Sequence, residues 1–189
     1  MRNLIFFVAI ILPLSIFGQS NELAISTGMV VHGDTYTPKH PEYYPMSYDM
    51  NVVANAKFAL RYGKVYKSGI SRGVQAQYNN VQYRYNGKFK ALAAPCYSGG
   101  LYIQYVVTKR KISPVFGISA HYITTGKTDV RFVEKLQGIS AYANAGIAYK
   151  LNKTFTVSAN VEYGKVMFIS YGKIYANAFG SNLCVTARL

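Results

Sequence analysis

The chain has 189 residues, and 21 Lys and Arg against 7 Asp and Glu give it a formal net charge of +14. This excess suggests nucleic acid as a partner, but the N-terminus predicts export and no nucleic-acid recognition motif is present, so we exclude that function. The mixture of 18 Tyr, 10 Phe and no Trp favours β-strands over helices. Beyond the N-terminus, no stretch is long and apolar enough to predict a transmembrane helix.

Residues 1–20 have the pattern of a cleavable secretory signal peptide. A positively charged start precedes an apolar run over residues 4–17, and small or polar residues follow it. A permanent membrane helix is the weaker interpretation, because the run is short and contains Pro13. We expect cleavage between positions 18 and 20, and a single exported domain over residues 21–189.

Eight segments of this domain alternate apolar and polar residues with the period of two that is typical of β-strands. In chain order they cover roughly residues 23–32, 51–62, 69–80, 98–108, 113–124, 139–150, 154–164 and 174–188. The sixth and seventh are the clearest, because one face of each carries no charge from Ile139 to Tyr149 and from Phe155 to Tyr163. Each is about ten residues long, which is the length that a tilted strand needs to cross a membrane.

The predicted connections between these strands alternate in length. The long ones are residues 33–50, 81–97, 125–137 and 164–173, and the short ones are residues 63–68, 109–112 and 151–153. Short turns at one end and long loops at the other are typical of outer-membrane barrels, whose turns face the periplasm. We therefore predict an all-β protein, an eight-stranded antiparallel up-and-down transmembrane β-barrel.

A soluble lipocalin-like carrier is the alternative, because its strands also alternate, with the apolar face inside. Two observations favour the membrane. The polar face is mainly Ser, Thr, Asn, Gln and Gly, whereas a water-facing sheet needs more charge. Aromatic residues also cluster at the strand ends and predict two interfacial girdles. The girdle residues are Tyr62, Tyr105, Phe116, Tyr149 and Phe155 near the turns, and Tyr78, Tyr122, Tyr163 and Tyr175 near the loops.

Three parts of the chain also carry a family resemblance: the signal ending in FGQS, the segment KALAAPCYSGGLYIQYVVTKRKISPVFGISAHY and the segment GIAYKLNKTFTVSANVEYG. In pattern they resemble the small outer-membrane β-barrel proteins of Gram-negative bacteria, of the OmpA and OmpX type and of the PorT-like family. The resemblance covers most of the exported domain and brings no catalytic motif. It implies a place in the outer membrane, in contact with its lipids.

Inside the predicted barrel, the polar face supplies three charged residues, Lys57, Arg61 and Glu162. We expect Glu162 to pair with Lys57 or Arg61 across the lumen, because an isolated interior charge is costly. An eight-stranded barrel is just wide enough for its own side chains, so we favour a structural plug. A narrow pore is the alternative.

Much of the positive charge is predicted to surround the turn end. The residues there are Lys64, Lys67, Arg72, Lys109, Arg110, Lys111, Lys150, Lys153 and Arg188, against Glu22 alone. Such a rim faces anionic lipid headgroups or cell-wall polymer, and each basic residue near an anionic surface contributes roughly 1 kcal/mol. The alternative is a rim that is merely solvated.

Catalytic chemistry has one candidate group, formed by His32, His121 and Ser119 at the loop end of the polar face. A lipid-modifying enzyme could use such a Ser and His pair. However, Ser119 and His121 stand about 7 Å apart on one strand, and no acid is placed beside them. No metal-ligand spacing is present either. We therefore expect no enzyme, no metal and no cofactor.

The first long loop, GDTYTPKHPEYYPMSYDM, is the best candidate for binding an extracellular partner, whose identity the sequence does not give. Its exposed aromatic residues on a rigid scaffold are typical of recognition surfaces, although a merely packed or disordered loop is as good an interpretation. The candidate residues are Tyr36, Tyr43, Tyr44 and Tyr48. Together the patterns predict a non-enzymatic barrel with a structural or adhesive role.

Overall fold

The computed structural model describes residues 20–34, 48–49, 54–85, 88–107, 110–126, 137–168 and 174–189. Positions 1–19 of the predicted signal peptide lie outside these ranges, so the signal peptide and its cleavage site stay predictions. Nowhere in these ranges is there a helix of the length and apolar character needed to span a membrane.

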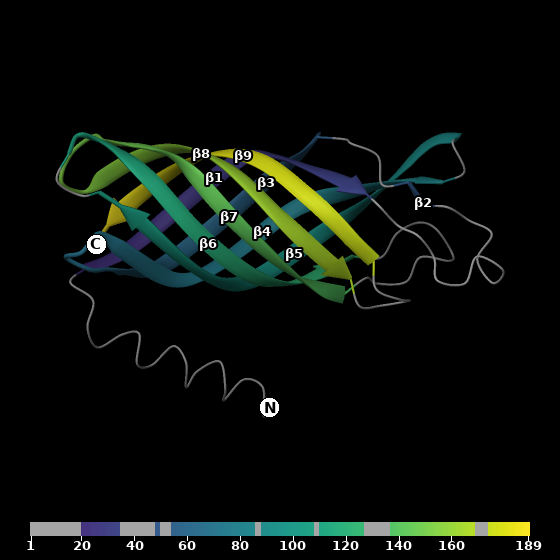
Figure 1. Ribbon diagram of the computed structural model, residues 1–189, viewed down its shortest axis with the longest axis horizontal. Helices are drawn as coiled ribbons and strands as arrows, with labels where there is room; N and C mark the ends of the chain where they lie inside the picture. The colour runs from purple at the N-terminus through teal and green to yellow at the C-terminus, as the bar shows by residue number, and fades with distance from the viewer. Residues whose placement is uncertain are drawn as a thin grey trace, which may run out of the picture.

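The described residues form nine strands, and eight of them make a closed antiparallel barrel (Figure 1). The strands are β1 Ser20–Asp34, β2 Tyr48–Asp49, β3 Ala54–Val65, β4 Ile70–Tyr85, β5 Lys88–Val106, β6 Ile112–Thr125, β7 Gln137–Lys150, β8 Phe155–Phe168 and β9 Ile174–Arg188. Around the barrel the order is β4, β3, β1, β9, β8, β7, β6 and β5, and β5 pairs with β4 to close the ring. The two-residue β2 pairs only with the end of β4. The predicted fold class, an eight-stranded up-and-down barrel, is confirmed.

Two predicted loops are wrong. The first half of the loop predicted at residues 164–173 belongs to β8, which continues to Phe168, and most of the loop predicted at residues 81–97 is strand. β4 continues to Tyr85 and β5 begins at Lys88, and the two strands stay paired through Val81↔Ala94 and Tyr83↔Leu92, with a register shift after Tyr83. These ends of β4 and β5 extend past the paired region of the other strands. Their backbone groups hydrogen-bond to each other, so the pairing does not require an apolar face. In the sequence, Val81, Tyr83 and Tyr85 still alternate with Gln82 and Arg84, but the apolar residues change from even positions in the preceding segment to odd positions here. This change of parity, and not a loss of alternation, interrupts the strand pattern.

The strands are strongly staggered around the barrel. From Leu23, the paired residues lead once around the ring and return to β1 at Gly33, ten residues farther along. The intermediate residues are Tyr62, Val74, Leu101, Ala120, Ala141, Lys165 and Asn177. With the usual rise per residue and spacing between strands, this stagger over eight strands corresponds to a tilt of about 40°.

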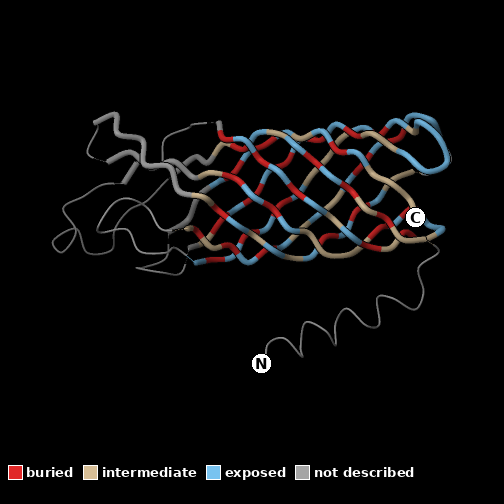
Figure 2. Tube along the Cα trace, turned by 180° about the vertical axis from the view of Figure 1, so that it is seen from behind, coloured by how far each residue is buried: buried red, intermediate tan, exposed pale blue. Residues whose placement is uncertain are grey.

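Buried and exposed residues alternate along the barrel strands, as Figure 2 shows. Many of the exposed residues are large and apolar, among them Ile25, Ile118 and Leu183, which are 60–62% exposed. The buried ones include many Ser, Asn and Gln side chains. A soluble lipocalin-like carrier needs the opposite orientation, with its apolar face inside, so that alternative is wrong. An apolar outer belt of this kind matches the hydrocarbon core of a bilayer.

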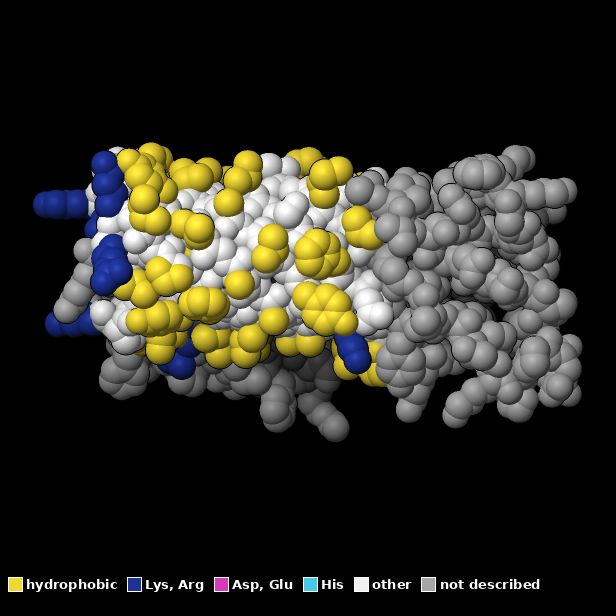
Figure 3. Space-filling view, turned by 45° about the horizontal axis from the view of Figure 1, so that its top comes forward, with side chains coloured by type: hydrophobic (Ala, Val, Ile, Leu, Met, Phe, Trp, Pro, Cys, Tyr) yellow, Lys and Arg dark blue, Asp and Glu magenta, His cyan; other side chains and the backbone are white. Residues whose placement is uncertain are grey.

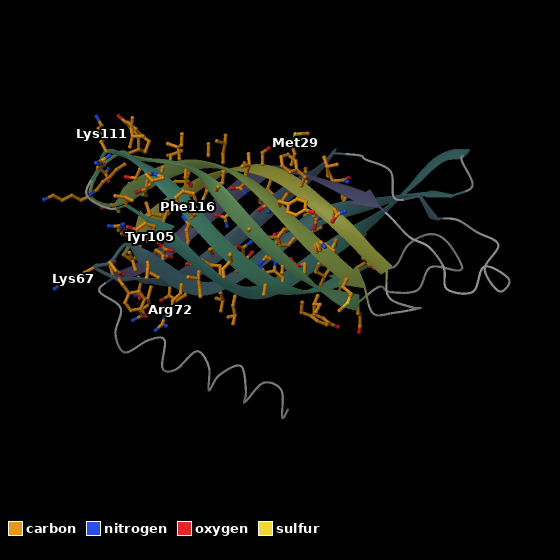
Figure 4. All side chains as sticks on the ribbon, in the orientation of Figure 1. Met29, Lys67, Arg72, Tyr105, Lys111 and Phe116 are labelled. Atoms are coloured by element: carbon orange, nitrogen blue, oxygen red, sulfur yellow. The ribbon has the colours of Figure 1, made fainter. Side chains whose placement is uncertain are left out.

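The aromatic residues predicted for the turn-side girdle are all exposed on the outer face: Tyr62, Tyr105, Phe116, Tyr149 and Phe155. Tyr105 lies directly opposite Phe116 on the neighbouring strand, and Figure 4 shows both near the turn end. On the loop side, Tyr78, Tyr122 and Tyr163 are exposed as well, while the side chain of Tyr175 lies outside the description. The belt is therefore bordered by aromatic rings, as in membrane barrels.

Candidate functional site

The interior of the barrel holds the three charged residues that the sequence placed there. Lys57 and Arg61 lie on β3, and Glu162 lies on β8. Lys57 is 3% exposed and Glu162 is 8% exposed. In the ring, β1 and β9 lie between β3 and β8. A side-chain contact between β3 and β8 therefore spans the lumen.

Glu162 pairs with Lys57, one of the two partners that the sequence left open. The ammonium group of Lys57 donates a hydrogen bond to Glu162 Oε1. Glu162 Oε2 accepts a second one from Asn182 Nδ2 at 3.3 Å. Gly180 lies directly opposite Glu162 in the ladder, where an added Cβ would come within 2.8 Å of Oε1. The glycine therefore leaves space for the carboxylate of Glu162, and the ammonium group of Lys57 compensates its buried charge.

Arg61 belongs to a second cluster, closer to the turns. Its Nη1 donates to Gln104 Oε1, and its Nη2 lies 2.9 Å from Cys184 Sγ. Its guanidinium lies over the Tyr102 ring, 5.2 Å from the centroid. Arg61 thus has neutral partners and an aromatic face, whereas the charge of Glu162 is taken by Lys57.

Glu22 also lies inside the barrel, which sequence reasoning missed. It is 8% exposed, and it accepts hydrogen bonds from Tyr102 Oη at 2.7 Å and from Ser71 Oγ. The sequence placed it on the basic rim, because the apolar pattern of the first strand starts only at Leu23. The available signal was the parity of the polar face, since Glu22 continues the buried series of Ala24 and Ser26.

Little open space remains between these two clusters. A cavity of about 20 Å³ is left, which is room for about one water molecule. Its lining residues are Ser26, Lys57, Arg61, Gln75, Ser119, Asn144, Asn160, Glu162 and Asn182. At this height the side chains fill the lumen.

The Ser and His pair of the enzyme hypothesis is not assembled. His121 points inward and is 4% exposed, and its ring lies 5.7 Å from the Tyr142 ring. Within the described part of the chain, neither of its ring nitrogens has a hydrogen-bond partner, so no bond to Ser119 exists there. The side chain of His32 lies outside the description. A nucleophile needs a base within hydrogen-bonding reach, and His121 does not hold that position for Ser119.

The metal-ligand and loop-tyrosine predictions can be compared with the structure only where residues are described. Among the described residues there is no group of three or more His, Cys, Asp or Glu that could hold a metal ion. Of the loop tyrosines, Tyr36, Tyr43 and Tyr44 lie outside the described ranges. Tyr48 is described only by its backbone, which pairs with Tyr85 at the end of β4. The loop site therefore stays a prediction.

The turn end carries the basic rim. Exposed cations there are Lys67, Arg110, Lys111 and Lys153, and half-buried ones are Lys64, Arg72, Lys150 and Arg188. Figure 3 shows dark blue side chains gathered at this end, and Figure 4 places Lys67, Arg72 and Lys111 there. Lys109 lies outside the described residues.

Two of these cations contact aromatic rings at the border of the apolar belt. Arg72 Nε donates to Tyr66 Oη at 2.8 Å, and its guanidinium lies 5.0 Å from the ring centroid. Lys111 Nζ lies 5.3 Å from the centroid of Tyr149, a girdle residue. A hydrogen bond with Tyr149 raises the pKa of Lys111 above its ordinary value. The contacts hold positive charge at the depth of lipid headgroups.

An apolar outer belt, two aromatic borders and a filled polar interior define a small outer-membrane β-barrel. No protein-family model matches the chain, and no curated protein is similar to it in sequence.

Solved structures show the same fold. Neisserial surface protein A, NspA, has a TM-score of 0.63 at 10% identity, over 87% of this chain and 96% of that one. The outer membrane protein OprG from Pseudomonas aeruginosa has a TM-score of 0.55 at 11% identity, over 92% of this chain and 98% of that one. The chain therefore has the architecture of the eight-stranded outer-membrane barrels.

Proposed function

We propose that the protein is a non-enzymatic barrel of the outer membrane with a structural or surface-interaction role. The filled lumen is the observation that carries this proposal. Lys57, Glu162 and Arg61 project into the lumen from opposite walls, and the space that remains between their clusters is only about 20 Å³. A hydrated ion needs a continuous aqueous path, so the interior acts as a plug and the function belongs to the surfaces that the barrel exposes.

Two surfaces are available for interaction. On the periplasmic side, the basic rim suits an anionic partner, either phospholipid headgroups or cell-wall polymer. On the outside, the tyrosine-rich loop is the binding candidate, because aromatic side chains supply large contact areas at low entropic cost. Its candidate residues are Tyr36, Tyr43, Tyr44 and Tyr48. The barrel would hold both surfaces at fixed heights on either side of the membrane.

The pore alternative is tested by recording from the purified, refolded protein in planar bilayers. We expect no steady unitary conductance. A matched variant, Lys57→Ala with Glu162→Ala, removes the central pair and should raise the frequency of conducting events. Steady conductance of the unmodified protein would refute the plug and promote the narrow pore.

The enzyme alternative needs a chemical readout. Outer membranes from cells that make the protein, its His121→Ala variant or neither should contain the same lipid A and phospholipid species by mass spectrometry. A lipid species that depends on the protein and disappears with His121→Ala would overturn the non-enzymatic role.

A further inference from the structure

The outer wall over β5, β6, β7 and β8 has a groove of about 590 Å³. The ladder register explains its shape through two neighbouring rows of outward side chains. One row is Leu101, Ala120, Ala141 and Lys165, and the other is Ile103, Ile118, Ala143 and Tyr163. Ala120, Ala141 and Ala143 form a low floor, and larger side chains rise around it on β5, β6 and β8. The result is a channel with apolar walls in the belt that faces lipid.

Lys165 lines this groove at its loop end and is exposed. Among the described side chains, it is the only charged one on the outer face of the loop half of the barrel. Its ammonium group has no hydrogen-bond or ion-pair partner within the described ranges. A charge on a lipid-facing wall is unfavourable unless it reaches an interface or meets a counter-charge.

The height of Lys165 matches the outer interface. Phe155 belongs to the turn-side girdle, and Lys165 lies ten residues farther along the same strand. At about 3.3 Å per residue and a tilt of about 40°, this separation is about 25 Å along the membrane normal. That value is the height of the apolar band in outer-membrane barrels, roughly 25 Å. The ammonium group therefore lies at the headgroup level of the outer leaflet.

A second groove on the outer wall provides a comparison within the same molecule. It covers about 570 Å³ over β1, β9, β8 and β7, and its outward residues include Met29, Ile147, Ala159 and Leu183. It is similar in size and also has an alanine floor, but none of its lining residues is charged. Both grooves can take an acyl chain, and only the first adds a cation for a phosphate.

We propose that the groove over β5 to β8 binds a phosphorylated glycolipid of the outer leaflet. Acyl chain would lie on the floor formed by Ala120, Ala141 and Ala143, and a phosphate would meet the ammonium group of Lys165. The loop end of an outer-membrane barrel faces the leaflet where lipid A, a phosphorylated glycolipid with several acyl chains, is the main lipid. The inference rests on the outer-membrane orientation and is independent of whether the lumen conducts.

The test uses the refolded barrel in neutral mixed micelles, titrated with diphosphoryl lipid A and analysed by native mass spectrometry. Lys165→Gln should lower the apparent affinity about fivefold, as expected for the loss of one interfacial cation. Ala141→Leu fills the floor and should lower it by a similar factor. Ala159→Leu makes the same change in the charge-free groove and should alter the affinity less than twofold. Lys165→Arg should retain binding.

Folding of every variant is checked by heat-modifiable migration on a gel, since these outward positions face detergent and should tolerate the changes. Unchanged affinity in both Lys165→Gln and Ala141→Leu would overturn the site. Equal binding of a dephosphorylated lipid A would overturn the role of the phosphate. A phosphatidylglycerol affinity that falls by the same factor in Lys165→Gln and Ala141→Leu would overturn the assignment to a glycolipid. Steady pore conductance would refute the plug described above and leave these lipid affinities as they are.

Discussion

The inner and outer faces of the same eight strands are stabilised in different ways. Inside, each described charge has a specific partner: Lys57 contacts Glu162, and Tyr102 donates to Glu22. Outside, apolar side chains such as Ile118 project from the barrel and are 60% exposed. The inner face therefore depends on which residues meet, whereas the outer face depends only on polarity and height in the bilayer.

Breaking the central pair should give the largest effect on this contrast. Glu162→Leu leaves the ammonium group of Lys57 buried without its counter-charge, and Lys57→Met does the same to the carboxylate. Each single change should lower the free energy of unfolding by about 3–5 kcal/mol. Urea titration of the barrel in lipid vesicles, followed by heat-modifiable migration, measures the loss.

The double variant, Lys57→Met with Glu162→Leu, is the control for this experiment. It replaces both charges with apolar groups of similar size and should return close to the stability of the unmodified protein. Single variants within 1 kcal/mol of the unmodified protein would show that the pair is not the constraint on the inner face.

A charge on the outer face should cost somewhat less and should depend on height. Ile118→Arg puts a cation near the middle of β6 on the lipid side and should lower the free energy of unfolding by about 2–4 kcal/mol. Met167→Arg places the same group at the loop end of β8, where about 0–1 kcal/mol is expected. The same urea titration compares them, and equal losses at both heights would contradict the assignment of the belt.

The smallest effect is expected at the basic rim, which belongs to neither face. Lys111→Gln or Lys153→Gln should weaken retention of phosphatidylglycerol in mixed micelles by about 1 kcal/mol each, because each removes one interfacial cation. Tyr149 raises the pKa of Lys111, so its contribution should persist to a higher pH than that of an ordinary lysine. Native mass spectrometry at low salt and in 0.5 M salt measures the retention. If the loss of retention in the variants is the same at both salt concentrations, the effect is not one of charge.

The period of two predicts which face a residue occupies, but not which residues meet. Ile118 outside and Ser119 inside follow from alternation alone. The choice of Lys57 over Arg61 as partner of Glu162 depends on the stagger of the ring, which brings Leu23 level with Gly33 after one circuit. The lengths of the turns and loops do not determine this ten-residue stagger. The prediction for Glu22 was wrong for a related reason. The inward-facing series of β1 begins at Glu22, one residue before the apolar outward series begins at Leu23.

The remaining differences between prediction and structure concern the β4–β5 hairpin, residues that the structure does not describe, and the groove on the outer wall. In the hairpin around Val81 and Ala94 the alternation changes parity after Asn80, so the sequence pattern predicts the end of a strand where the backbone pairing continues. The tyrosines of the first loop and the signal peptide stay predictions. The groove beside Lys165 arises from three alanines on adjacent strands, and their proximity follows only from the register.

The seam between β1 and β9 has a consequence for how the protein reaches its final state. It joins Glu22 to Arg188 and Asp34 to Ala176, so it closes only after all the strands from β1 to β9 have been made. Contacts between residues so distant in sequence form late and slow the folding of β-proteins. Until they form, both edge strands present unpaired backbone groups, which hydrocarbon does not tolerate. Insertion and closure are therefore expected to be one concerted step, and a chain without β9 should stay outside the bilayer as an open, aggregation-prone sheet.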